Sequence, residues 1–179
     1  MKIKSCFFII LAVFLLNGCA TQAKSKNEFS INKSPKIYKL DLDCDGKKEI
    51  IDIQDNSDKN GESILTIAKP DRSKIDSISF AGRFIRLEFI DLNADDNKQI
   101  AVYSQRENNC TNLIIYRLNN SKLLTIFNTG SSYGIDTSFG SVLARISVAK
   151  LKYSEKNPSL SDTVEWERWV WVGERFIKE

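Results

Sequence analysis

The chain has 179 residues, of which 42% are hydrophobic and 27% charged, and its 26 Lys and Arg against 23 Asp and Glu give a net charge of +3. This length is enough for one domain with a sizeable core, and the composition excludes wholesale disorder. The net charge of +3 is too small to suggest a nucleic-acid-binding surface, which would need a basic stripe, and we expect no nucleic-acid partner. The complete absence of histidine excludes His-dependent nucleophilic catalysis and His-ligated zinc or haem.

The first 18 residues have the pattern of an export signal. Lys2 and Lys4 flank the start of an apolar run of 11 residues, Cys6–Leu16, which fits a signal peptide and is too short to span a membrane. The next residues, Leu16-Asn17-Gly18-Cys19, resemble the lipobox of bacterial lipoproteins, although Asn17 departs from the small or apolar residue usual there.

The lipobox resemblance implies cleavage before Cys19, attachment of diacylglycerol to its thiol, and acylation of the new N-terminus, typically with palmitate. Several acyl chains together anchor a protein stably, where a single chain would not. Ala20 resembles the residue that sorts lipoproteins of Gram-negative bacteria to the outer membrane. The resemblance therefore implies a cell-envelope protein on the periplasmic or the surface side. An ordinary cleaved signal peptide with a chance cysteine stays open as the alternative.

We expect residues 19–35 to comprise the cysteine that the resemblance implies is lipidated and a polar, flexible tether, and residues 36–179 have the pattern of one all-β domain. In the domain, short runs of β-branched and aromatic residues are separated by turn clusters such as Asp45-Gly46 and Asn119-Asn120. The expected strands are Ile37–Leu42, Glu49–Ile53, Ser63–Ala68, Ile75–Phe80, Phe84–Ile90, Gln99–Tyr103, Asn112–Leu118, Lys122–Phe127, Val142–Tyr153, Thr163–Val172 and Arg175–Lys178. About 11 short strands predict an antiparallel all-β fold.

An internal repeat joins four of these strands in two pairs. Leu40–Gln54 aligns with Ile90–Ser104 at an offset of 50 residues, with five identical positions, and in both copies an acidic loop connects two apolar strands. A period of 40–50 residues made of short strands is typical of one β-propeller blade.

The first acidic loop has the spacing of a calcium site. Oxygen ligands at alternate positions can wrap one calcium ion, and Gly46 allows the loop to turn back toward it. The candidate ligands are Asp41, Asp43, Asp45, Glu49 and, through its backbone carbonyl, Lys47. Four carboxylates in nine residues repel one another unless a cation lies among them. An Asp-Gly hairpin with solvated acids is the alternative.

The second acidic loop is a weaker copy of the first. Its candidate ligands are Asp91, Asn93, Asp95, Asn97 and Gln99. The amides keep oxygen ligands but remove two negative charges, and Asp96 stands where the first loop has its glycine. The second loop is therefore either a weaker calcium site or a turn that has lost its metal.

The two loops with their flanking strands resemble the FG-GAP/VCBS type of repeat found in exported β-propeller proteins. That resemblance implies calcium-stabilised blades and a role in adhesion or binding, without implying any one reaction. A closed propeller needs at least four blades, whereas this chain has room for about three. We expect a short propeller-like stack of two to three blades, with a β-sandwich as the alternative.

Two further features concern the remaining cysteines and the tryptophans. An exported protein can form disulfides, so Cys44 and Cys110 are a candidate pair, although spacing does not show that they come close enough.

In Val164–Val172, strand alternation places Trp169 and Trp171 on one face and Trp166 on the other. Apolar residues on both faces favour a strand buried on two sides. An exposed tryptophan platform for sugars or proteins is the alternative.

The sequence thus favours a non-enzymatic, membrane-anchored domain that binds or scaffolds, with calcium as cofactor and an envelope protein or a glycan as partner. One alternative is a cell-envelope polysaccharide hydrolase using paired carboxylates, of which Glu165 and Glu167 are an example. Another is a structural subunit that completes its sheet with a partner chain.

Overall fold

The computed structural model describes residues 36–56, 58, 61–140, 144–152 and 163–179. The signal segment, Cys19 and the tether lie outside these residues, as do the ends of the expected strand Val142–Tyr153. The chain divides into two compact units, Met1–Asn32 and Lys33–Glu179, and all described residues belong to the second. No helix in the described ranges is long and apolar enough to cross a membrane.

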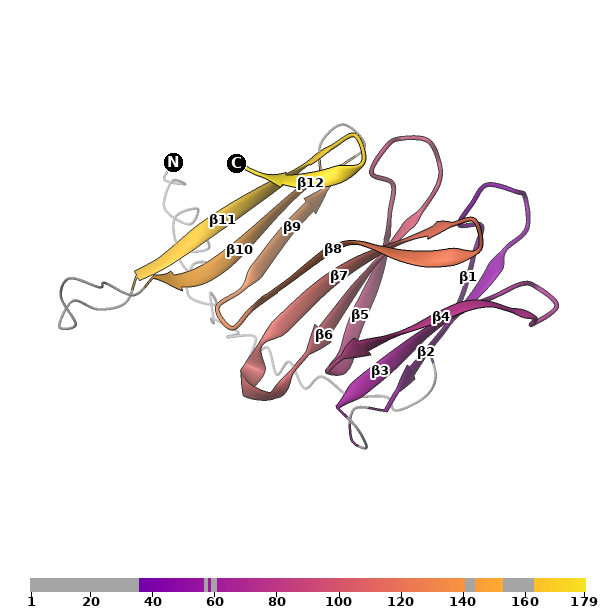
Figure 1. Cartoon of the computed structure of the whole chain (residues 1–179), viewed down its shortest axis with the longest axis horizontal. Helices are drawn as coiled ribbons and strands as arrows, with labels where there is room; N and C mark the ends of the chain where they lie inside the picture. The colour runs from indigo at the N-terminus through magenta and orange to yellow at the C-terminus, as the bar shows by residue number, and fades with distance from the viewer. Residues whose placement is uncertain (1–35, 57, 59–60, 141–143, 153–162) are drawn as a thin grey trace, which may run out of the picture. The chain divides into compact units, whose positions relative to one another are not determined.

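The second unit is all-β, with three antiparallel sheets of four strands each (Figure 1). The first sheet contains β1 (Lys36–Leu40), β2 (Glu49–Asp55), β3 (Glu62–Ala68) and β4 (Lys74–Ala81). The middle sheet contains β5 (Arg83–Ile90), β6 (Gln99–Gln105), β7 (Thr111–Asn119) and β8 (Lys122–Ser131), with the short 3₁₀ helix η1 (Glu107–Asn109) between β6 and β7. The last sheet contains β9 (Ile135–Phe139), β10 (Ala144–Lys152), β11 (Thr163–Val172) and β12 (Arg175–Lys178).

Each sheet is a meander in which consecutive strands are hydrogen-bonded neighbours, as in a propeller blade. Tight turns between consecutive strands allow this order. In the β7–β8 hairpin, Asn119 pairs with Lys122, and the two residues between them, Asn120 and Ser121, both have positive φ. A two-residue turn of this kind matches the twist of the strands it joins. The sequence therefore correctly predicted an antiparallel propeller-like fold, and the count of three sheets excludes the two-layer sandwich.

The middle sheet is buried on both faces, because alternate residues of its strands enter two different cores. On β6, Ile100 and Val102 pack into a cluster shared with the first sheet, whereas Ala101 and Tyr103 pack into a cluster shared with the last sheet. The first and last sheets therefore cover opposite faces of the middle sheet. Each of them is left with one face that neither core cluster includes.

Two expectations from the sequence need correction. The structure has twelve strands, because Ile135–Phe139 forms β9 and pairs with β10. On β11, Trp169 and Trp171 do face the core, but on the opposite face only Val170 is buried, whereas Trp166 and Val172 are 51% and 53% exposed. Most of that face is exposed because the last sheet has a neighbouring sheet on one side only.

Candidate metal centre

The two acidic loops occupy the same place in successive sheets and have the same conformation. The first connects β1 to β2 and the second connects β5 to β6. The Asp41 Oδ2 atom accepts a hydrogen bond from the Gly46 amide at 2.9 Å, and the Asp91 Oδ2 atom accepts the equivalent bond from the Asp96 amide at 3.0 Å. Asp96 adopts φ of 65° where Gly46 has 83°. The internal sequence repeat is therefore also a structural repeat, which includes the backbone conformation with positive φ at Gly46 and Asp96.

The side chain at the ninth position of each loop, Glu49 or Gln99, accepts a hydrogen bond from a backbone amide at the start of the same loop. The Glu49 Oε2 atom accepts a hydrogen bond from the Leu42 amide at 2.8 Å, and the Gln99 Oε1 atom accepts one from the Leu92 amide at 2.9 Å. Both side chains are buried. Burial raises the pKa of the Glu49 carboxyl and the charges of Asp43 and Asp45 raise it further, against the lowering effect of the hydrogen bond from Leu42.

In the first loop, three carboxylates converge. Asp41, Asp43 and Glu49 each place an oxygen within 4.8 Å of the others. The Asp41 Oδ1 atom is buried and accepts no hydrogen bond from any residue that the structure describes. A buried acceptor without a donor is costly, and a cation would satisfy it. The residues present therefore fit a hard cation with oxygen ligands.

The other two predicted ligands of this loop are placed differently. Asp45 is not one of the three converging carboxylates; its Oδ1 atom accepts a hydrogen bond from the Lys47 amide at 2.8 Å. Its other carboxylate oxygen lies 3.8 Å from the Lys47 ammonium. Asp45 shapes the turn in the structure as it stands, and Lys47, whose backbone carbonyl is the remaining predicted ligand, lies two residues further along the chain.

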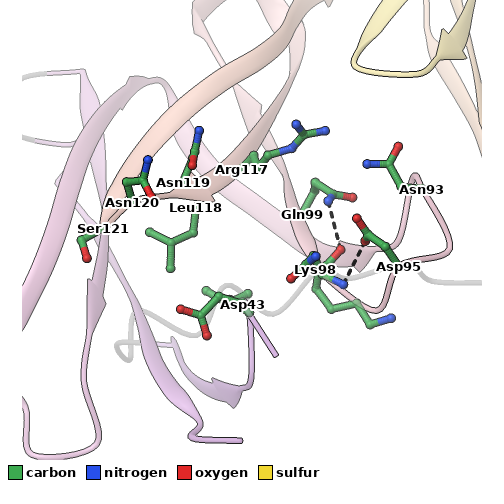
Figure 2. A pocket seen from close by; sticks show the side chains of 12 residues that line it. Asp43, Asn93, Asp95, Lys98, Gln99, Arg117, Leu118, Asn119, Asn120 and Ser121 are labelled. Atoms are coloured by element: carbon green, nitrogen blue, oxygen red, sulfur yellow. Dashed lines mark hydrogen bonds between the residues drawn. The ribbon is translucent and has the colours of Figure 1, made fainter. Parts of the chain in front are cut away.

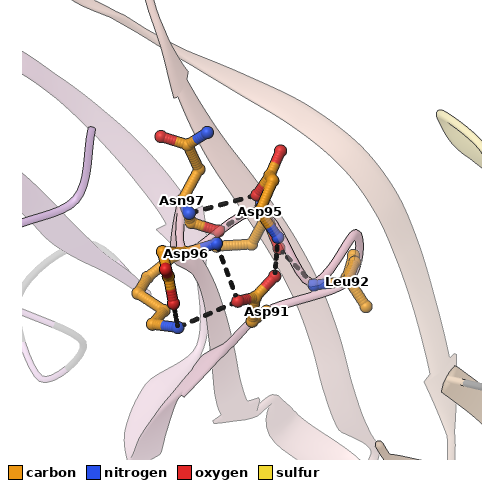
Figure 3. Close-up of polar contacts among 7 residues, drawn as sticks. Asp91, Leu92, Asp95, Asp96 and Asn97 are labelled. Carbon is orange, nitrogen blue, oxygen red and sulfur yellow. Dashed lines mark hydrogen bonds and ion pairs between the residues drawn. The ribbon is translucent and has the colours of Figure 1, made fainter. Parts of the chain in front are cut away.

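In the second loop, a lysine supplies the positive charge (Figure 3). The Lys98 ammonium lies 3.0 Å from Asp91 Oδ2 and 3.8 Å from Asp96 Oδ1. Burial raises the pKa of the Asp91 carboxyl, but the bonds from Lys98 and from the Asp95 and Asp96 amides outweigh it, and the net pKa is lowered. The same hydrogen bond with Asp91 raises the pKa of Lys98. Lys48 occupies the equivalent position in the first loop but makes no ion pair with a described residue.

The remaining predicted ligands of the second loop also have protein partners. The indole Nε1–H of Trp171 donates to Asn93 Oδ1 at 2.9 Å. The Gln99 side-chain amide donates to the Asn97 carbonyl at 3.0 Å, and the Asn97 amide donates to Asp95 Oδ1 at 3.1 Å. Both carboxylate oxygens of Asp91 accept hydrogen bonds, from the Asp95 amide at 3.2 Å and the Asp96 amide at 3.0 Å, whereas Asp41 Oδ1 in the first loop has no partner among the described residues.

The two loops meet at a polar cleft of about 430 Å³ that sequence reasoning did not identify (Figure 2). The Lys98 amide donates to the Leu42 carbonyl at 3.2 Å and joins the loops. The turn between β7 and β8 forms the opposite wall through Asn119 and Asn120, and Asp43 faces the same cleft. The Asn-Asn pair was recognisable as a turn, but only the fold brings that turn beside the acidic loops.

The candidate disulfide between Cys44 and Cys110 is not formed, and both thiols are free. Cys44 lies on the first loop, close enough to Asp96 and Lys98 of the second to interact with their charges. Cys110 lies beyond the opposite end of β6, next to Thr111, which pairs with Gln105. The length of β6 separates those ends by about 20 Å, which is far beyond the reach of a disulfide.

No family model matches the sequence, and no curated protein matches it. Among solved structures, the chain is similar to the periplasmic lysozyme inhibitor of I-type lysozyme from Aeromonas hydrophyla, with 14% identity and a TM-score of 0.42, over 53% of this chain and 87% of that chain. It is also similar to the β-propeller domain of the Trilobed protease from Pyrococcus furiosus, described as having an open velcro topology. There the identity is 14% and the TM-score 0.43, over 82% of this chain and 42% of that chain. Both likenesses concern the arrangement of strands.

Proposed function

We propose that this protein is an exported lipoprotein, anchored through Cys19, whose three-sheet domain binds or scaffolds at the cell envelope and is stabilised by calcium in its first acidic loop. The observation that carries the calcium proposal is the buried, unpartnered Asp41 oxygen beside the Asp43 and Glu49 carboxylates. Calcium prefers such oxygen ligands, and Asp45 and the Lys47 carbonyl are available to complete the set.

Binding of calcium here would fix the connection between β1 and β2, and through it one wall of the polar cleft. Asp43 belongs both to the converging carboxylates and to the cleft lining. The cleft walls carry amides, two cations and carboxylates, which suit a polar ligand such as a glycan or a protein segment. The second loop is proposed to keep its shape without a metal, because Lys98 provides the positive charge.

Isothermal titration of the isolated domain, residues 33–179, with calcium chloride tests the metal site. We expect one ion per chain, no comparable heat with magnesium, and loss of binding in Asp43→Ala. Asn93→Ala is the matched control, because it alters the same position of the second loop, and it should leave the calcium stoichiometry unchanged. Absence of binding to the unaltered domain would refute the calcium proposal.

The lipid anchor is tested separately on the full chain. Metabolic labelling with palmitate in a bacterium that processes lipoproteins should label the protein, and Cys19→Ala should abolish the label. The same substitution should release the protein from the membrane fraction. Labelling that survives Cys19→Ala would show that the lipobox resemblance is misleading.

The hydrolase alternative requires two carboxylates that face one groove. Glu88 and Asp136 both line an open groove of about 560 Å³ between β5 and β9. Glu88 is paired with Arg86 at 3.2 Å. Glu167, of the pair considered from the sequence, is bonded to Lys178 at 2.7 Å. Incubation with peptidoglycan separates the two functions: release of soluble sugar supports the hydrolase, and retention without release supports the binding domain.

A further inference from the structure

The outward side of the last sheet carries exposed apolar side chains that no core cluster covers. Strand alternation and the β10–β11 and β11–β12 registers place Val164, Trp166, Val172 and Ile177 on this side, which we call the end face. Their side chains are 47%, 51%, 53% and 41% exposed, respectively. An exposed apolar stripe of this kind on a soluble domain marks an interaction surface.

Arginines alternate with these apolar residues in the centre of the end face. Arg168 follows Trp166 at the next position on the same side of β11. Arg145 pairs with Val170, and Arg175 pairs with Val172 across β11 and β12. The end face therefore presents cations and apolar groups together.

The three guanidinium groups make no ion pair with any residue of the described ranges. Two acidic side chains share this side: Asp136 lies on the edge strand β9, and Glu179 follows β12 opposite Arg168, whose carbonyl accepts a hydrogen bond from the Glu179 amide at 2.9 Å. Unpaired arginines beside exposed aliphatic and aromatic groups have the composition of a surface that meets an anionic, partly apolar partner.

Charge argues against a second copy of this chain as that partner. If the end faces of two copies packed against each other, the arginines of one copy would lie opposite the arginines of the other. The corresponding free face of the first sheet carries two lysines, Lys39 and Lys74, and two acids, Asp52 and Glu62, so it offers no excess of negative charge to the arginines in a head-to-tail contact. Like charges held face to face are unfavourable.

We propose that the end face binds the surface of an anionic phospholipid bilayer, with Trp166 at the level of the headgroups and the arginines on lipid phosphates. Tryptophan prefers this interfacial level, and arginine pairs well with phosphate. In one respect this rests on the proposed lipid anchor: a tether from Cys19 to Lys36 extends at most about 60 Å, which keeps the domain within reach of the bilayer.

The test uses the isolated domain, residues 33–179, which is one compact unit and contains both core clusters. Binding is measured by flotation with vesicles of phosphatidylcholine alone and of equal parts phosphatidylcholine and phosphatidylglycerol. We expect binding to the mixed vesicles, weakened by salt, and none to phosphatidylcholine alone. Since Cys19 is absent from this domain, the result does not depend on acylation.

Variants test whether the end face is the part of the domain that binds the vesicles. Arg168→Gln should weaken binding about fivefold, which corresponds to about 1 kcal/mol for one arginine at an anionic surface. Trp166→Ser should weaken binding and remove quenching of tryptophan fluorescence by brominated lipid. The matched controls are Lys74→Gln, on the other free face, and Leu124→Ser, which is 44% exposed on β8; both should bind as the unaltered domain does.

The proposal is overturned if the domain does not bind the mixed vesicles, a result that would leave an acidic protein surface as the partner of this face. It is equally overturned if Arg168→Gln and Trp166→Ser, shown by circular dichroism to be folded, bind as tightly as the unaltered domain. Equal binding to both kinds of vesicle would also contradict it, because the arginines would then contribute nothing.

Discussion

The indole nitrogen of Trp171 lies 2.9 Å from the Oδ1 atom of Asn93, joining the last sheet to the second acidic loop across 78 residues of sequence. The Trp171 ring also packs against Phe176, with 5.1 Å between ring centroids, and the Arg117 guanidinium lies over its face at 5.5 Å. The loop that resembles a calcium site therefore serves as a connection between two sheets.

Trp171→Phe should destabilise the domain by about 1–2 kcal/mol, because the ring contact with Phe176 is largely kept while the hydrogen bond to Asn93 is lost. Asn93→Ala should destabilise by a similar amount. A double-mutant cycle, measured by urea unfolding, should give a coupling free energy near 1 kcal/mol between the two residues. Strict additivity of the two substitutions would show that the hydrogen bond contributes nothing.

Lys98→Met should destabilise the domain by about 1 kcal/mol, since it leaves the Asp91 carboxylate without its partner in a partly buried position. With the internal cation removed, calcium should stabilise this variant more than it stabilises the unaltered domain. Lys48→Met is the control, because Lys48 has the equivalent position without an ion pair in the described structure. The comparison is made by thermal unfolding with and without calcium.

Glu49→Gln should leave the fold intact and remove the stabilisation by calcium. The second loop already shows that glutamine can accept the closing hydrogen bond, since Gln99 does so from the Leu92 amide. The lost negative charge and the weaker amide ligand reduce calcium affinity. Circular dichroism checks the fold and calcium titration checks the affinity. A variant that unfolds would show that Glu49 has a structural role that glutamine does not replace.

Acidification should weaken calcium binding as the pH falls through the pKa of Glu49, which burial raises above its usual value. Calcium requires the ionised carboxylate, so binding releases a proton when Glu49 is protonated. Without calcium, the contribution of Glu49 to the stability of the domain depends on pH in the opposite direction. A carboxyl with a raised pKa in the folded state contributes less stability as the pH rises through that pKa. Calcium titrations of the unaltered domain at several pH values check the first effect. Urea unfolding without calcium checks the second, and Glu49→Gln should lose the pH dependence that Glu49 contributes there.

The repeat made much of the candidate site predictable from the sequence. The spacing of acids in the first loop predicts a calcium site formed by Asp41, Asp43, Asp45, Glu49 and the Lys47 carbonyl, and the structure brings together the carboxylates of Asp41, Asp43 and Glu49. The offset of 50 residues predicts a second loop of the same kind, and the structure shows the same turn there. The role of Lys98 was not predictable, because Lys48 is identical at the aligned position. The two loops differ in the number of carboxylates near this lysine: Lys98 has Asp96 beside it in addition to Asp91, and the first loop has Gly46 at the position of Asp96.

The features that the sequence did not predict depend on contacts between distant segments. The strand β9 is short and half-exposed, and only its alternation of Ile135, Thr137 and Phe139 signals it. The contact between Trp171 and Asn93 needs the packing of two sheets to form. The exposure of Trp166 follows from the position of its sheet at one end of the stack, which local pattern does not reveal.

The most direct test of the calcium proposal is a thermal melt of residues 33–179 in EDTA and then in about 2 mM calcium. With a Kd of about 0.1 mM, typical of extracellular calcium modules, this concentration adds about 1.8 kcal/mol of stability, or about 4–7 °C in Tm. We predict that shift for the unaltered domain, with no equal effect of magnesium and with most of it lost in Asp43→Ala. Identical melts in EDTA and calcium would contradict the proposal and would leave the converging carboxylates as residues of an ordinary turn.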